Sequence, residues 1–222
     1  NYALDDEMVT LNNERVEMGI KGIPKILRTV HSMDEKSHYE YRPVVLISFA
    51  LEYEFFGRNP RVSHFINVFL YALTCVLIFY FLLKLTCPPT TNNSLELQHL
   101  IFPLLAALLF TAHPIHTEAV DNLKSRDELL ALLNSLVATV FFMRFRESKN
   151  KLSLIGGFLF LFLAILSKKT AMVFIAIVPM VFFFTKNISW KQIVFVGLIA
   201  FSAFITYAVF KRIMIPEKPL RA

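Results

Sequence analysis

The sequence predicts an all-α, multi-pass integral membrane protein: a bundle of transmembrane helices with an extramembrane loop that carries a short interfacial helix. Two observations lead to this fold class. Of the 222 residues, 55% are hydrophobic and only 18% are charged, with a mean hydropathy of +0.54, whereas soluble domains are about 25% charged. The chain also contains six consecutive stretches without a charged residue, at 62–83, 97–112, 129–143, 152–167, 170–185 and 192–210.

These six stretches also exclude several other classes of protein. The apolar content rules out disorder and collagen. A soluble bundle of six such helices would have almost no polar face for water. The net charge is +6, but the phenylalanines lie within the apolar stretches instead of alternating with basic residues, so we expect no nucleic-acid partner. Cys75 and Cys87 are too few for a disulfide framework or a cysteine zinc site.

The lengths of the stretches predict six crossings of the membrane. The first and last are long enough for a hydrocarbon core of about 30 Å, and the shorter middle ones are flanked by charged residues that can snorkel to the surface. We therefore divide the chain into an extracytoplasmic loop (1–61), a six-helix transmembrane bundle (62–210) and an extracytoplasmic tail (211–222). The chain begins with Asn, not Met, and is expected to be a fragment that lacks its true start.

Six crossings place the acidic residues on one side of the membrane. The side formed by 1–61, 113–128, 168–169 and 211–222, called here the acidic side, holds 15 of the 17 Asp and Glu. The other side, formed by 84–96, 144–151 and 186–191, is called the basic side. Its short loops carry seven Lys and Arg, against four in the short loops of the acidic side. The positive-inside rule therefore favours a cytoplasmic basic side, and polar chemistry is expected on the acidic side.

The loop 1–61 contains an acidic pair and a candidate surface helix. Asp5 and Asp6 stand near its start, where by composition alone they form a solvated acidic loop. Residues 44–56 are apolar but too short and too polar to span, which indicates a helix lying on the membrane surface. Gly57 and Pro60 are expected to end it. Arg42, just before this helix, stands in a Tyr-Arg-Pro turn that suits an anchor at the lipid headgroups.

The loop 113–128 is the most polar part of the bundle. His113, His116 and Glu118 have a spacing that permits a zinc site on one helical face, but hydrogen bonding to a polar ligand and a simple interfacial cluster remain alternatives. Ser125 and Glu128 have the spacing of a helix capping box. This capping explains neither the histidines nor Arg126 beside Asp127.

A short turn between two predicted crossings carries Lys168 and Lys169. Two interpretations stay open for this pair. The lysines either anchor the turn at the membrane surface by snorkelling or hold a phosphate there as point charges.

Four blocks of these residues, taken together, resemble the membrane part of the transmembrane and tetratricopeptide-repeat-containing (TMTC-like) protein O-mannosyltransferases, within the lipid-phosphosugar-dependent (GT-C) glycosyltransferases. The blocks are the acidic pair Asp5-Asp6; Tyr41-Arg42-Pro43 with Ser48, Phe49, Gly57, Pro60, His64 and Asn67; His113 to Val120 with Arg126-Asp127; and Ser167-Lys168. Lys169 stands where the family usually has Glu. The family's first transmembrane helix and its C-terminal repeats are absent from this sequence.

The resemblance implies transfer of a sugar, expected to be mannose, from a polyprenyl or dolichyl phosphate to Ser or Thr hydroxyls of a protein acceptor, with inversion. It implies a base at Asp5 or Asp6. The phosphate or sugar would be bound by Arg42, His113, His116, Glu118, Arg126, Asp127 and Lys168. No cofactor is expected, apart from the alternative of a divalent metal at the histidines. The site would face the extracytoplasmic or lumenal side of a bacterial inner membrane or the endoplasmic reticulum.

Two alternatives compete with this interpretation. A catalytically silent member of the same family would serve as a membrane scaffold. A transporter is disfavoured because transporters usually place ionisable groups near the middle of the membrane, whereas the six stretches contain none.

Overall fold

The regular elements are helices throughout the described part of the chain. The computed structural model describes residues 13–29, 41–86, 97–184 and 189–215. The longer helices are α3 (Pro43–Phe56), α4 (Pro60–Thr86), α5 (Leu97–Ala112), α7 (Arg126–Ser148), α8 (Lys151–Ser167), α9 (Phe174–Phe184) and α10 (Trp190–Met214). The shorter ones are α1 (Glu14–Glu17), η2 (Gly19–Gly22), α2 (Ile23–Leu27), α6 (Ile115–Asp121), η3 (Leu123–Ser125) and η4 (Lys169–Val173). The predicted all-α membrane helix bundle is confirmed.

Length and composition identify three membrane-spanning helices among the described residues. They are α4, the continuous segment Leu123–Ser148 and α10. A fourth is added if α5 and α6, bent by 63° at their junction, count as one span. Helix α8 and the segment Lys169–Phe184 are apolar but shorter; 17 residues of α-helix extend only about 25 Å. Six crossings therefore stay a prediction, as does the division of the chain that rests on them.

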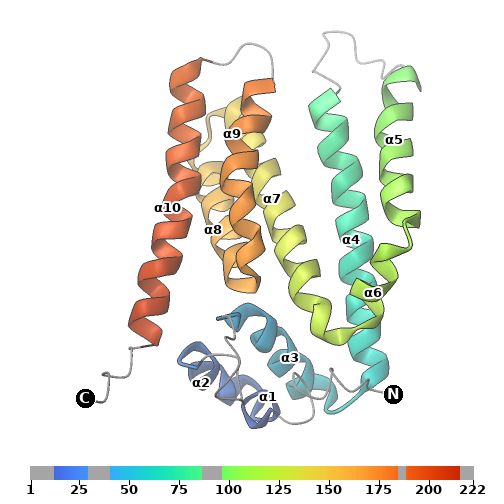
Figure 1. Cartoon of the computed structure of the whole chain (residues 1–222), viewed down its shortest axis with the longest axis vertical. Helices are drawn as coiled ribbons and strands as arrows, with labels where there is room; N and C mark the ends of the chain where they lie inside the picture. The colour runs from blue at the N-terminus through green and yellow to red at the C-terminus, as the bar shows by residue number, and fades with distance from the viewer. Residues whose placement is uncertain (1–12, 30–40, 87–96, 185–188, 216–222) are drawn as a thin grey trace.

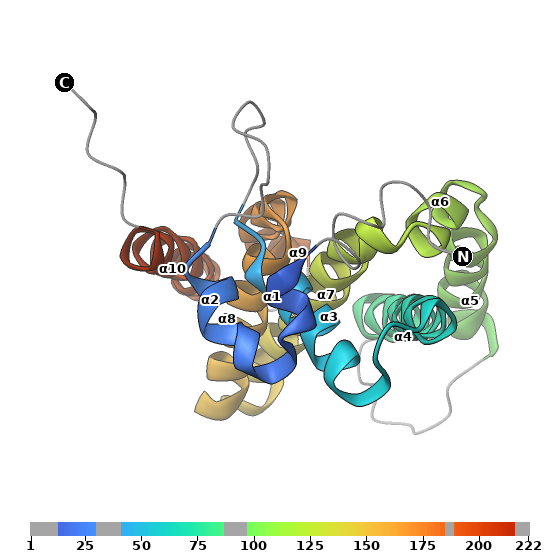
Figure 2. The same cartoon turned by 90° about the horizontal axis from the view of Figure 1, so that it is seen from below.

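Six apolar helices lie side by side and alternate in direction: α4, α5, α7, α8, α9 and α10 (Figure 1). As a result, α3, the end of α6, the start of α7 and the α8–η4 junction all lie at one end, called here the lower end. The α5–α6 bend lies higher, beside the middle of α4, where the hydroxyl of Tyr71 donates to the carbonyl oxygen of Thr111 at 3.0 Å. Apart from the residues at this bend, the lower end carries the described residues of the predicted acidic side, and the upper end carries those of the basic side. Seen from below, α1, α2 and α3 lie across the lower end of the helices (Figure 2).

Helix α3 forms where the surface helix was predicted. Pro43 suits its first turn because the missing N–H would be unpaired there. One face, including Val45 and Phe49, packs into a small core with α1, α2 and Leu123. Gly57 ends the helix with φ 61°, a conformation that costs glycine little. The predicted break is therefore present.

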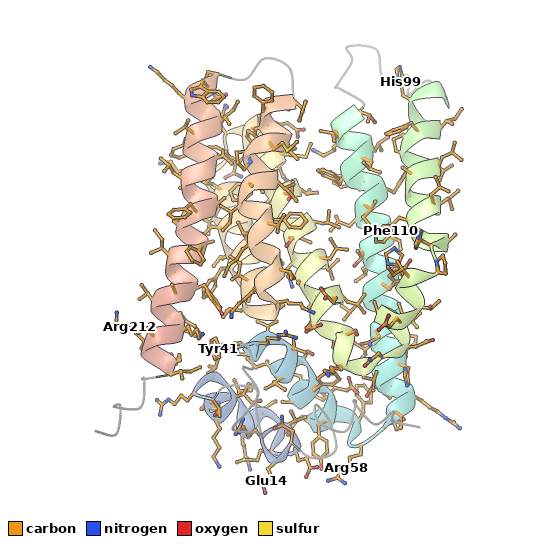
Figure 3. All side chains as sticks on the ribbon, in the orientation of Figure 1. Glu14, Tyr41, Arg58, His99, Phe110 and Arg212 are labelled. Atoms are coloured by element: carbon orange, nitrogen blue, oxygen red, sulfur yellow. The ribbon has the colours of Figure 1, made fainter. Side chains whose placement is uncertain are left out.

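The main core lies between α7, α8, α9 and α10. Gly157 lets α7 and α8 approach closely, since a Cβ added to it would lie 2.9 Å from the ring of Phe142. Tyr41 joins this core to the lower layer (Figure 3). Its hydroxyl donates a hydrogen bond to the carbonyl of Leu27 at 2.7 Å. Burial, together with Tyr207, raises the pKa of Tyr41 to about 12, which keeps this donor protonated.

The predicted capping box at Ser125 and Glu128 is wrong. Helix α7 begins directly at Arg126, after the turn η3, and the side chain of Ser125 makes no capping hydrogen bond. Asn122 caps the turn instead, accepting from the backbone N–H of Lys124 at 3.0 Å. The carboxylate of Glu128 is drawn to Lys168, because an ion pair with a cation competes with the local backbone contact.

Candidate functional site

Arg126 lies at the centre of a buried polar cluster at the lower end of the bundle. Its side chain is fully buried. The guanidinium donates to Glu52 (Nη1–Oε2, 2.8 Å) and to Asn67 (Nε–Oδ1, 2.8 Å). A third bond runs to the carbonyl oxygen of Ser63 at 3.1 Å, and the ring of Phe49 lies 3.8 Å from the guanidinium carbon. One side chain therefore connects α3, α4 and α7.

The partners of Arg126 are themselves held in place. The hydroxyl of Ser63 donates a short hydrogen bond to Glu52, and the amide of Asn67 donates to the carbonyl oxygen of Val120 at 3.3 Å. Buried polar groups that are all hydrogen-bonded stabilise one arrangement of the surrounding helices. The cluster therefore fixes the position at which α7 starts, and so the position of Asp127.

Asp127, the next residue, forms a second cluster that reaches the surface. Its carboxylate is 4% exposed and lies against Arg42 Nη1 and, at 3.4 Å, Lys168 Nζ. Lys168 also forms an ion pair with Glu128. The two cations are 23% and 18% exposed, so an anion from outside can reach them without unfolding the site. Segments before α3, at the start of α7 and after α8 thus converge on one carboxylate.

Lys168 is positioned by the end of α8. Its backbone adopts an extended conformation (φ −157°, ψ 139°) at the C-cap, and its N–H donates to the carbonyl of Ala164 at 3.0 Å. The side chain therefore turns back toward α7 instead of continuing along α8. Lys169, which stands at the position where Glu was expected, is half-buried at the start of η4.

A groove of about 260 Å³ begins beside these charges and runs between α7 and the η4–α9 segment. Its lining is mainly apolar, and Glu128 stands at its charged end. The residues that line it are Glu128, Ala131, Leu132, Ser135, Thr170, Ala171 and Phe174. The hydroxyl of Ser135 is buried there without a hydrogen-bond partner among the described residues. The arrangement places a mainly apolar channel next to two accessible cations.

The histidines form a separate group at the α5–α6 bend, next to Phe110, which is labelled in Figure 3. The ring of His116 lies 4.1 Å from that of Phe110 and 5.6 Å from that of Tyr71. His113 is exposed, and its Nδ1 accepts from the N–H of Ile115 at 3.3 Å. Glu118 is exposed on α6, the short helix that also carries His116.

The structure does not bring all the predicted site residues together. Arg42, Asp127 and Lys168 meet. His113, His116 and Glu118 lie on α6 and its approach, and the described residues contain no group of three His, Cys, Asp or Glu suited to a metal ion. Asp5 and Asp6 lie outside the described residues. Arg126 is enclosed by Glu52, Asn67 and Ser63, which gives it the place of a positioning residue; its contact with a phosphate stays a prediction.

Sequence reasoning missed Glu52 and Ser63 as partners of Arg126. Glu52 interrupts an apolar helix that was interpreted as lying on a membrane surface, where an acid needs no partner. The signal that could have identified it is its position on the same helical face as Phe49, three residues earlier. Such an acid is buried with the apolar face, and burial requires a cation.

The sequence is similar to curated protein O-mannosyl-transferases over half or more of its length. Mouse TMTC1 is 36% identical over 111 residues, which are 50% of this chain and 11% of that protein. Drosophila melanogaster Tmtc1 is 30% identical over 174 residues, or 77% of this chain and 19% of that protein. Human TMTC3 is 32% identical over 119 residues, or 54% and 12%. The chain thus spans between about a tenth and a fifth of the length of these relatives. No family model and no solved structure matches.

Proposed function

We propose that this chain, which belongs to the TMTC-like family of protein O-mannosyl-transferases, forms the donor-binding membrane part of a glycosyltransferase. The reaction moves a sugar, mannose by analogy with the relatives' names, from a polyprenyl or dolichyl phosphate to a Ser or Thr hydroxyl of a protein. The observation that carries the proposal is the convergence of Arg42 and Lys168 on Asp127 beside an apolar groove.

The layout suits a donor that is part lipid and part charged. A polyprenyl chain stays in the membrane or in an apolar groove, while its phosphate and sugar lie at the surface. Arg42 can bind a phosphate through two parallel N–H groups, and Lys168 adds a point charge. Asp127 keeps the two cations close together when no donor is bound. Glu128 is exposed, so Lys168 can leave this carboxylate and pair with the phosphate of the donor.

The chemical step needs a base and a stabilised leaving group. A carboxylate, Asp5 or Asp6, takes the proton of the acceptor hydroxyl. The hydroxyl oxygen forms a bond to the anomeric carbon from the face opposite the phosphate, and the bond from that carbon to the phosphate oxygen breaks. The electron pair stays on the phosphate, where Arg42 and Lys168 stabilise the added charge. Attack from the opposite face inverts the anomeric centre.

The remaining predicted residues have supporting places in this proposal. Arg126 positions the start of α7 through its bonds to Glu52 of α3 and Asn67 of α4. His113, His116 and Glu118, on α6 and at the bend before it, contact the sugar or the acceptor. No metal takes part in the step. The lower end faces the extracytoplasmic or lumenal compartment, and the upper end faces the cytoplasm.

Separate substitutions of the two acidic residues test the proposal. We expect Asp5→Asn or Asp6→Asn, whichever removes the base, to lower mannosyl transfer in membranes by about 10²- to 10⁴-fold. Donor binding should persist in that variant. Full activity in both variants would exclude the base assignment. Donor binding by the unaltered protein without any turnover would favour the silent scaffold.

A further inference from the structure

A second, cationic cavity lies at the opposite end of the bundle. It has a volume of about 230 Å³ and lies where the end of α7 meets α9 and the start of α10. Its polar walls are Arg146, Lys149, Lys191 and Gln192, and its apolar walls are Phe145, Phe182, Phe195 and Val196. This is the upper end in Figure 1, away from Arg42 and Lys168.

The three cations of this cavity are not neutralised by ion pairs within the described residues. The nearest acid in the sequence, Glu147, turns to the other face of α7 and binds Lys84 of α4 at 2.8 Å. Lys149 lies over the ring of Phe145, with Nζ 5.9 Å from its centre. No acidic residue is among those that line the cavity. The cavity between α7 and α10 is therefore lined by positive charge and offers space for an anion.

We propose that this cavity binds the phosphate headgroup of an anionic phospholipid of the surrounding bilayer. A phosphate group is the anion that three cations and a side-chain amide suit best. The lipid source follows from the walls, because the phenylalanines below the cations would pack against the upper part of an acyl chain. Basic cavities between membrane helices are typical sites for anionic headgroups. The site lies on the basic side and is independent of the donor site.

The single tryptophan of the chain offers a local readout. Trp190 precedes Lys191 at the start of α10 and is 68% exposed. Its fluorescence is quenched by brominated acyl chains that reside next to it. The full protein would be placed in bilayers that contain either brominated phosphatidylglycerol or brominated phosphatidylcholine at equal mole fraction. We expect stronger quenching by the anionic lipid.

A matched pair of double variants separates the cavity from general surface charge. A direct charge-assisted hydrogen bond to a phosphate is worth roughly tenfold in affinity, so Lys149→Gln with Lys191→Gln should lower the preference for phosphatidylglycerol roughly 100-fold. Arg144→Gln with Lys151→Gln removes two exposed cations from the same end that do not line the cavity. Salt screens charges that make no contact with the headgroup, so this variant should keep most of the preference. Lys149→Arg with Lys191→Arg should keep it, and circular dichroism checks the fold of each variant.

Three results would overturn the proposal. Equal quenching by the two lipids in the unaltered protein would show that the cavity does not select an anion. Equal loss in both glutamine variants would assign the preference to the surface as a whole. Loss of the preference on addition of millimolar inorganic phosphate would show that the ligand is a free phosphate, not a lipid.

Discussion

Arg126 and Glu52, 74 residues apart in the sequence, form a buried ion pair with Nη1 and Oε2 2.8 Å apart. The pair joins the surface helix α3 to the start of α7. It thereby positions Asp127, which forms ion pairs with Arg42 and Lys168. The position of the cations at the lower end therefore depends on a contact that no donor touches.

We predict that Arg126→Met lowers the free energy of unfolding by about 3 to 5 kcal/mol, because it leaves the carboxylate of Glu52 buried without its partner. Thermal or denaturant unfolding in detergent measures the loss. Lys84→Gln is the control, since it removes an exposed ion pair with Glu147 and should cost at most about 1 kcal/mol. Equal losses in the two variants would mean that the buried cluster does not organise the lower end.

Close packing of α7 on α8 gives a second prediction. Gly157→Ala should lower the free energy of unfolding by about 1 to 3 kcal/mol, because the added methyl group must displace Phe142. Gly197→Ala is the matched control, since its Cβ would lie 3.7 Å from Pro179, an ordinary contact. The two variants are compared by their thermal midpoints in the same detergent. A Gly157→Ala variant as stable as Gly197→Ala would contradict the described helix packing.

The groove beside Lys168 gives a prediction about the donor. Thr170→Trp places a bulky ring on the exposed lining of the groove, and the KM for a long-chain polyprenyl donor should rise about tenfold or more because the chain is displaced. Leu163→Trp, at an exposed position on α8 outside the groove, should leave the KM unchanged. Kinetics with unaltered KM in the Thr170→Trp variant would exclude this groove as the path of the lipid chain.

The sidedness of the site gives a prediction that needs no enzyme assay. Glu118→Cys at the lower end should react with a membrane-impermeant thiol reagent from the lumenal or extracytoplasmic side, and Lys151→Cys at the upper end should not, in a background without native cysteines. The N-glycosylation motifs Asn92-Asn93-Ser94 and Asn187-Ile188-Ser189 belong to loops of the predicted basic side, and the proposed cytoplasmic location of that side predicts that both stay unmodified in a secretory-pathway host. Labelling of both cysteines from one side would show that the two positions do not lie on opposite sides of the membrane. Labelling of the Lys151→Cys variant alone from the lumenal side would invert the orientation.

The sequence was enough to predict the helices, the break at Gly57 and the gathering of Asp127 with Lys168 at one end. These predictions follow from the positions of the apolar stretches and from the alternating direction of successive helices, both of which can be read from the sequence. Arg42 could be assigned to the same group only through the resemblance, because a Tyr-Arg-Pro turn also suits a headgroup anchor.

The sequence could not predict which charges are buried. Arg126 and Asp127 are neighbours, yet a helix directs adjacent side chains about 100° apart, and one enters the protein while the other faces the site. Glu52 and Ser63 became partners of Arg126 through the packing of α3 against the start of α4; the helical face that Glu52 shares with Phe49 predicts its burial, but not which cation it meets. Ser125 does not form the capping box because it belongs to the turn η3, in which its own N–H already donates to the carbonyl oxygen of Asn122 at 3.0 Å.

The most direct test of the account is mannosyl transfer from a polyprenyl phosphate donor by the variant Arg42→Gln with Lys168→Gln. Removing two groups that stabilise charge on the leaving phosphate should lower kcat/KM by about 10²-fold or more. Lys211→Gln with Arg212→Gln removes two cations from the same end of the bundle (Figure 3) and should stay within about twofold. A folded Arg42→Gln, Lys168→Gln variant that transfers mannose at the unaltered rate would contradict the assignment of this site.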